Sequence, residues 1–92
     1  MIVRISGEGQ FDLADSESAR LNELESAVIA AVDAGEEDGY TRAFTELLDY
    51  VRATGREVPD DELEGSDVIL PPADISLQEA AADFTGEGLI PD

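Results

Sequence analysis

The side chains that could do chemistry in this sequence of 92 residues are carboxylates, hydroxyls and arginines, because cysteine, histidine and lysine are all absent. Without histidine and cysteine the chain lacks the usual general base, the thiolate nucleophile and the usual nitrogen and sulfur metal ligands. Ser–His–Asp and Cys–His centres therefore cannot be assembled from this chain alone. A carboxylate pair could hydrolyse a glycoside, but only in a sugar-sized cleft, which a chain this short does not build. We expect a protein without enzymatic activity.

Oxygen ligands for a cation are concentrated in residues 57–67. Six carboxylates in this stretch could bind a hard cation such as Ca²⁺ or Mg²⁺, namely Glu57, Asp60, Asp61, Glu62, Glu64 and Asp67. Residues 33–39 resemble a calcium loop but lack its D-x-D-x-D-G spacing and its distal glutamate. Solvated carboxylates are the better interpretation of both segments, so we expect no metal and no cofactor. Binding of a small ligand or a divalent cation by residues 57–67 is the alternative function.

The net charge of −18 limits the partners that the chain can bind. Nucleic-acid binding needs a cationic surface, and docking on anionic lipid is disfavoured for the same reason. No apolar run approaches the ~20 residues that span a bilayer, and the N-terminus lacks the apolar core and cleavage site of a signal peptide. We therefore expect a cytoplasmic protein that neither binds nucleic acid nor inserts directly into a membrane.

All five basic residues are arginine. An acidic surface without lysine resembles the cytosolic proteins of salt-accumulating archaea. At ~1 M salt the Debye length falls to ~3 Å, so neighbouring carboxylates repel each other weakly. In dilute buffer the same charges would destabilise the fold. We infer that the protein is halophilic.

Arg4 differs from the helical arginines, which are flanked by acidic residues. It has no acidic residue within three positions, and it alternates with apolar residues on a predicted strand. The outer face of that strand also carries Ile2. An arginine without a local partner beside an exposed isoleucine predicts a contact surface.

The beginning of the chain predicts a β-hairpin, because Val3 and Ile5, and then Phe11 and Leu13, alternate with polar residues. These apolar side chains share one face when Ile5 lies opposite Phe11 and Val3 lies opposite Leu13. The register leaves Gly7-Glu8-Gly9 as a three-residue loop with a glycine at its third position, where a left-handed conformation is favoured. A phosphate-binding loop is the poorer interpretation, because the G-x-G-x-x-G fingerprint leads from a strand into a helix.

Two amphipathic helices are predicted next. The first begins at Asp15 or Ser16, either of which could cap it, and ends at Gly35. Its apolar side chains recur with helical spacing, at Leu21, Leu24, Ala27, Val28, Ala31 and Val32. The second covers about 37–53, and its apolar stripe is Tyr40, Ala43, Phe44, Leu47, Leu48 and Val51. The connection is so short that the two helices must run antiparallel.

Residues 56–75 are predicted to form an extended connector. It contains one helical turn after Pro59, and a short third strand or extended segment at 68–70. A third helix begins at Ser76, where Ser-Leu-Gln-Glu fits the capping box. The apolar residues after that helix, at 89–90, are expected to lie in a groove.

Five segments of the sequence resemble the PspAA proteins, small partners of phage shock protein A (PspA). They are MIVRISGEGQF at 1–11, VPDDEL at 58–63, SDVILPPAD at 66–74, SLQE at 76–79 and GLIP at 88–91. The resemblance implies a non-enzymatic adaptor in the envelope-stress response built around PspA, a coiled-coil membrane-remodelling protein related to ESCRT-III. It implies a PspA-like partner and a location peripheral to the membrane through that partner.

Six residues are the candidate contacts with such a partner. Three are the matching polar positions near the hairpin, and three are apolar positions on the hairpin and the tail. They are Arg4, Glu8, Gln10, Ile2, Leu89 and Ile90.

Together these elements predict one α+β domain over residues 1–92. An N-terminal β-hairpin packs on an antiparallel helical hairpin, followed by an extended connector with a short third strand and a short C-terminal helix. A lone two-stranded hairpin is marginally stable. We therefore expect the hairpins of two chains to pair edge to edge or face to face in a homodimer.

Overall fold

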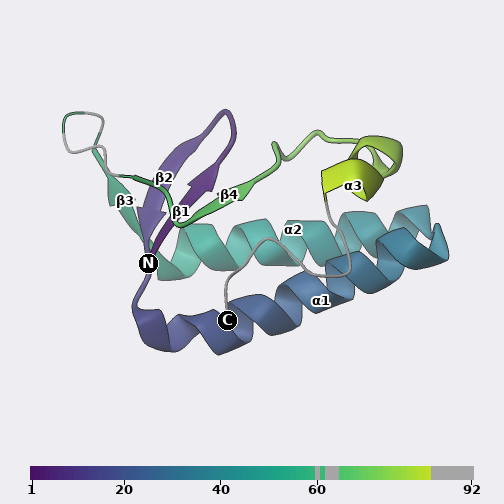
Figure 1. Cartoon of the computed structure of the whole chain (residues 1–92), viewed down its shortest axis with the longest axis horizontal. Helices are drawn as coiled ribbons and strands as arrows, with labels where there is room; N and C mark the ends of the chain where they lie inside the picture. Colours follow the sequence, from purple (N-terminus) through teal and green to yellow (C-terminus); the bar gives the residue numbers. More distant parts are fainter. Residues whose placement is uncertain (60, 62–64, 84–92) are drawn as a thin grey trace.

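The computed structural model describes residues 1–59, 61 and 65–83, and it has an α+β fold in two layers (Figure 1). A β-sheet forms one layer and an antiparallel pair of long helices forms the other, with the apolar core between them. A short third helix packs on one end of the helix pair. The predicted fold class is therefore confirmed.

The sheet has four strands in the order β3-β2-β1-β4. The predicted hairpin forms the two central strands, β1 (Ile2–Ile5) and β2 (Gly9–Asp12). The short strand predicted at 68–70 is confirmed as β4 (Val68–Leu70), which runs parallel to β1. The strand β3 (Arg56–Val58) pairs with β2 in the region predicted to be a connector. Its sequence, Arg-Glu-Val, is too short and too charged to show a strand pattern, and it pairs because β2 offers an open edge.

The register of the hairpin differs from the predicted one by two residues. Val3 lies opposite Phe11 and Ile5 opposite Gly9, so the loop is 6–8. The loop is a tight turn, in which the N–H of Glu8 donates to the carbonyl of Ile5 at 2.9 Å and Gly7 has a φ of 84°. A shift of two residues leaves every side chain on the same face, so the apolar pattern could not select between the two registers.

The predicted helical hairpin is confirmed. A 3₁₀ turn at Asp15–Glu17 leads into α1 (Ser18–Ala34), and α2 (Glu37–Thr54) returns beside it. Gly35 ends α1 in the left-handed conformation, with a φ of 66°. The predicted side-chain caps at the start of α1 are wrong, because no side chain caps the 3₁₀ turn or α1, and Asp15 instead accepts a hydrogen bond from the Met1 ammonium at 3.2 Å.

The third helix, α3 (Leu77–Asp83), begins where the capping box predicts. The N–H of Glu79 donates to the hydroxyl of Ser76 at 3.2 Å, and that hydroxyl donates to the Glu79 carboxylate at 3.0 Å. The predicted turn after Pro59 falls mostly outside the described residues, as does the predicted tail at 89–90.

The core lies between the helix pair and the inner face of the sheet. Gly55, between α2 and β3, allows a close approach of the two layers, because a Cβ there would lie 2.8 Å from Leu13 Cδ1 and 2.9 Å from Phe11 Cβ. Within the described part of the chain, no helix is long and apolar enough to cross a membrane. The buried apolar residues that make up the core are Val3, Ile5, Leu13, Leu21, Leu24, Val28, Tyr40, Phe44, Leu47, Leu48, Val51, Val68, Leu70 and Ala80.

Candidate functional site

The outer face of the sheet, turned away from the helices, carries an exposed pair of side chains. Arg4 on β1 lies directly opposite Ile69 on β4 in the parallel register, so their side chains are neighbours on one face. Arg4 is exposed and Ile69 is 57% exposed. Among the described residues, Ile69 is the only large apolar side chain that is exposed. We call Arg4 and Ile69 the outer-sheet patch.

Arg4 also differs from most other arginines in its partners. Within the described residues, neither Arg4 nor Arg42 has a carboxylate oxygen within 4.0 Å of its guanidinium. The other three arginines form ion pairs, which are Arg20–Glu23 at 3.0 Å, Arg52–Glu8 at 2.5 Å, Arg52–Asp49 at 2.9 Å and Arg56–Asp12 at 3.9 Å. Arg42 therefore forms no such ion pair within the described residues, although acidic residues flank it in the sequence.

Ile2, predicted to be exposed beside Arg4, is only 8% exposed. The chain entering β4 lies against it, since the Asp67 carboxylate accepts a hydrogen bond from the Ile2 N–H at 2.8 Å. The Asp67 N–H also donates to the Ile2 carbonyl at 2.8 Å. Ile2 is therefore an internal residue, and its predicted exposure is wrong because a parallel strand occupies the side of β1 that a lone hairpin leaves open.

Gln10, another predicted contact, is only 2% exposed although it lies on the outer face. It pairs with Arg4 on one side and Val58 on the other, and its amide Nε2 donates to the hydroxyl of Ser66 at 2.9 Å. The strands β3 and β4 lie at opposite edges of the sheet. The contact with Ser66 places the described residues just before β4 on the outer face, beside the buried Gln10.

Glu8, the third predicted polar contact, links the hairpin turn to the end of α2. Its two carboxylate oxygens accept hydrogen bonds from Arg52, at 2.7 Å from Nε and 2.5 Å from Nη2. Such a two-point pair is stronger and more directional than a single ion pair. The hydrogen bond from Arg52 lowers the pKa of Glu8, and the same bond raises the pKa of Arg52. Glu8 therefore has a structural role, because it joins the hairpin turn to the C-terminal end of α2.

The acidic stretch 57–67 shows no metal centre in its described part. No group of three or more acidic side chains in residues 1–59, 61 and 65–83 is placed to hold a metal ion. The Asp67 carboxylate is already engaged by a backbone N–H of β1. Two predicted contacts, Leu89 and Ile90, lie outside the described residues.

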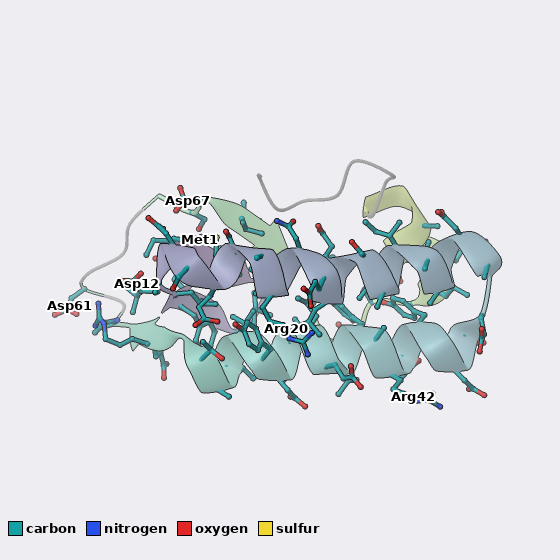
Figure 2. All side chains as sticks on the ribbon, turned by 90° about the horizontal axis from the view of Figure 1, so that it is seen from below. Met1, Asp12, Arg20, Arg42, Asp61 and Asp67 are labelled. Atoms are coloured by element: carbon teal, nitrogen blue, oxygen red, sulfur yellow. The ribbon has the colours of Figure 1, made fainter. Side chains whose placement is uncertain are left out.

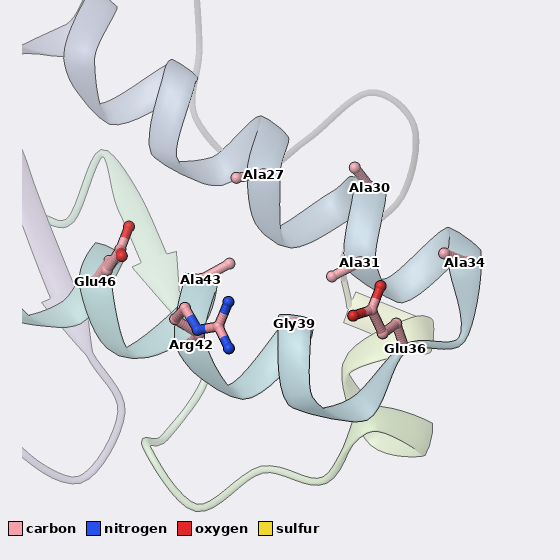
Figure 3. A pocket seen from close by; sticks show the side chains of 9 residues that line it. All are labelled: Ala27, Ala30, Ala31, Ala34, Glu36, Gly39, Arg42, Ala43 and Glu46. Atoms are coloured by element: carbon pink, nitrogen blue, oxygen red, sulfur yellow. The ribbon is translucent and has the colours of Figure 1, made fainter.

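The sequence did not single out the outer face of the helix pair. An open hollow of about 310 Å³ lies there between α1 and α2 (Figure 3). Four alanines of α1 line one side, and Arg42 with neighbouring residues of α2 lines the other. The lining residues are Ala27, Ala30, Ala31, Ala34, Glu36, Gly39, Arg42, Ala43 and Glu46.

A second hollow of about 490 Å³ continues along the same two helices. It is lined by Arg20, Leu24, Glu46, Asp49 and Tyr50. Glu46 borders both hollows, and we call the two together the helix groove. The excess of alanine on one side of α1 was the signal in the sequence that could have drawn attention to it.

Comparison with families of known proteins gives one match. A family model named PspAA, described as PspA-Associated protein, matches residues 1–92. No curated protein and no solved structure matches the chain.

Proposed function

The chain belongs to the PspAA family of PspA-associated proteins, and from this premise we propose that it is a non-enzymatic adaptor of a PspA-type envelope-stress system. It acts through protein–protein contacts and carries no cofactor. The observation on which the proposal depends most is the outer-sheet patch, where Arg4 lies beside Ile69. The match over the whole chain also confirms the resemblance that the sequence motifs indicate.

The outer-sheet patch has the chemistry of a contact surface. Arginine is enriched at interfaces and at their energetic hot spots, since its guanidinium combines hydrogen bonding with a flat apolar face. Ile69 offers apolar area beside it, 57% exposed. Both residues belong to paired strands of one sheet, so little backbone order has to be gained on binding.

The partner that this patch fits presents a carboxylate next to apolar side chains. We propose that this partner is the coiled coil of a PspA-like protein. The adaptor then lies in the cytoplasm and reaches the membrane periphery only through that protein. At ~1 M salt, electrostatic attraction is screened within ~3 Å. The apolar contact at Ile69 therefore supplies most of the affinity, and Arg4 determines the orientation of the partner.

Titration calorimetry of the chain with a PspA-type coiled-coil protein in 2 M KCl tests the proposal. We expect Ile69→Asp and Arg4→Glu each to weaken binding about 30-fold, which corresponds to about 2 kcal/mol for a hot-spot residue. Arg56→Glu is the matched control, because it makes the same change of charge on β3 at the far edge of the sheet. Wild-type chain that gives no binding heat and no co-purification would overturn the adaptor role itself. Equal affinity of all three variants would overturn only the assignment of the patch.

The acidic, lysine-free composition supports a halophilic host, and we propose that the fold requires salt. Screening of 23 carboxylates against each other should raise the melting temperature between 0.1 M and 2 M KCl. A melting temperature that stays constant or falls over this range contradicts the proposal.

A further inference from the structure

The two edges of the sheet differ in charge. The edge strand β3 carries Arg56 and Glu57, both exposed, and charged side chains on an edge discourage pairing with further strands. The edge strand β4 consists of Val68, Ile69 and Leu70, none of which is charged. Within the described residues, no strand pairs with β4 on the side away from β1. This part of the structure therefore has one edge protected by charge and one apolar edge that is open.

The open side of β4 presents the backbone of Ile69. The N–H of Ser6 donates to the carbonyl of Leu70 at 3.0 Å, so the backbone groups of Leu70 face β1. Because successive residues of a strand turn their N–H and C=O groups to opposite sides, those of Ile69 face the open side. The Ile69 amide is therefore the position at which any cover of this edge can be measured.

The open edge lies on the α1 side of the molecule. Gly55 joins α2 to β3, so β3 is the edge on the α2 side, and β4 is the opposite edge. Figure 2, which views the helix pair with the sheet behind it, shows Asp67 at the entry to β4 on the α1 side. The strand β4 therefore lies beside the flank of α1 that is turned away from α2.

That flank of α1 carries Glu25, Ile29 and Val32. Ala27 lines the hollow between α1 and α2, and residues two positions before and after it lie on the other side of a helix. Glu25 is only 3% exposed, and Ile29 and Val32 are half-buried and pack against the core. We call this flank, together with the open side of β4, the β4–α1 surface.

We propose that residues 84–92 of the same chain, which we call the tail, cover the β4–α1 surface. The tail lies outside the described part of the chain and follows α3, which ends at Asp83. It forms an intramolecular strap along the open side of β4, with Leu89 and Ile90 against the flank of α1. The inference does not depend on the proposed adaptor function. It gives these two residues, which were predicted to contact a partner, a role within the fold.

The first argument is reach. The helix α3 packs on both long helices, and its Ala80 is fully buried in the core. The chain that leaves α3 therefore starts beside the helix pair. Residues 84–92 span up to about 30 Å when extended, whereas α1, with 17 residues, is about 26 Å long. The tail is long enough to return along α1 as far as β4.

The second argument is composition. The tail contains three large apolar side chains, Phe84, Leu89 and Ile90. Among the described residues, by contrast, Ile69 is the only large apolar side chain that is exposed. Packing the tail against the half-buried flank of α1 removes apolar area from water, and this contribution is not weakened by the salt that screens the charges of the chain.

The third argument is effective concentration. A segment tethered to the same fold acts at a local concentration on the order of 1 mM. A second copy at tens of micromolar is therefore at a disadvantage of about 100-fold for the same edge. The tail occupies the β4–α1 surface unless another segment binds there more tightly by at least that factor.

The structure also removes the reason for placing a dimer on the hairpin. That expectation rested on a hairpin with two open edges, whereas β3 and β4 of the same chain occupy both. The homodimer stays a prediction, and a second copy on the open side of β4 is the competing occupant that the experiment must distinguish.

Amide hydrogen exchange of the full chain, followed by NMR in 2 M KCl, tests the proposal at Ile69. We expect the Ile69 amide to be protected equally at all protein concentrations, and Ile90→Asp to accelerate its exchange at least about tenfold. Thr85→Asp is the matched control, since it adds the same charge at a polar position of the tail. An unprotected Ile69 amide, or equal rates in the two variants, overturns the proposal. Protection that increases with protein concentration also overturns it, because a second copy then covers the edge.

A spin label tests the position of the tail directly, without removing an apolar side chain. The chain has no cysteine, so Asp92→Cys provides a single site for a thiol-directed label. We expect the label to broaden the amide signals of Val68–Leu70 and Glu25 more than that of Ala30, on the outer face of the helix pair. The opposite order overturns the proposal. So does broadening between labelled and unlabelled chains in a mixture, because the tail would then cover the edge of another copy.

Discussion

The outer face of the sheet and the outer face of the helix pair lie on opposite sides of one core, but they differ in how far the chain itself covers them. Over the sheet, the described residues that lead into β4 contact Gln10 and Ile2, both of which are buried, while the outer-sheet patch stays exposed. Over the helix pair, Ala27, Ala30 and Ala34 remain exposed in the described part of the chain. The sheet side is thus partly covered by the chain itself, whereas the helix side stays open around these alanines. Chemically matched substitutions on the two sides should therefore have unequal effects on stability.

The largest difference is expected for a methyl group added at two glycines, one where the sheet meets the helix pair and one on the outer face of the helix pair. Gly55→Ala places its Cβ 2.8–2.9 Å from Leu13, Phe11 and the Val51 carbonyl, so overpacking should cost about 2 kcal/mol and lower the melting temperature by about 10 °C. Gly39→Ala on the helix side meets only the flexible side chain of Glu36 at 3.3 Å. There the gain in helix propensity should stabilise the chain by about 0.5–1 kcal/mol. Thermal melting in 2 M KCl measures both, and equal shifts would show that the packing around Gly55 is no tighter than that around Gly39.

A smaller difference is expected for one serine hydroxyl on each side. Ser66→Ala removes the acceptor of the Gln10 amide, which is nearly fully buried, and should cost about 1–2 kcal/mol. Ser26→Ala removes an exposed hydrogen bond to the carbonyl of Asn22 and should change the stability by less than about 0.5 kcal/mol. Salt-matched urea unfolding compares the two. If Ser66→Ala proved as mild as Ser26→Ala, the hydrogen bond from Gln10 to Ser66 would contribute little to stability.

The smallest difference concerns two ion pairs and depends on pH. Arg52 lowers the pKa of Glu8 below its ordinary value of 4.5 in the folded chain, so the folded state binds that proton less tightly than the unfolded state. The stability from this pair is therefore present above about pH 4.5 and is lost as the pH falls through the folded pKa. Glu8→Gln should cost about 0.5–1 kcal/mol at pH 7, because both side chains are about one-third exposed, and progressively less as the pH falls below about 4.5.

The control for that prediction is the exposed pair Arg20–Glu23 on the helix side. Glu23→Gln should cost less than about 0.5 kcal/mol. The measurement is the difference in unfolding free energy from the wild type at several pH values. A Glu8→Gln deficit that persists unchanged at pH 3 would show that the carboxylate charge is not its cause.

Most of the secondary structure follows from local patterns, which explains why it could be predicted from the sequence. Helical spacing of apolar residues predicts α1 and α2, and the serine-glutamate capping box predicts the start of α3. The hairpin register could not be predicted, because two registers that differ by two residues bury the same face. The positive φ of Gly7 in the tight turn distinguishes them, and it becomes visible only in the structure.

The candidate site was harder to predict, because it depends on contacts between distant parts of the chain. Arg4 is exposed, as expected, but its apolar neighbour is Ile69, which pairs with it 65 positions along the chain. Gln10 and Glu8 match the family pattern as polar residues, yet Ser66 and Arg52 engage them inside the fold. Neither partner follows from helical or strand periodicity, so sequence reasoning could not separate an internal polar residue from a contact residue.

The central position of β1 in the sheet has a consequence for how the chain folds. Its antiparallel neighbour follows at once in the sequence, but its parallel neighbour is β4, at Val68–Leu70. During synthesis, the hairpin is therefore made early, and its β2 edge stays unpaired until residue 58 has emerged and its β1 edge until residue 70 has emerged. Because open strand edges invite pairing with other chains, and because closing a distant pair is slow, the interval before β3 and β4 arrive is when this protein is most prone to aggregate.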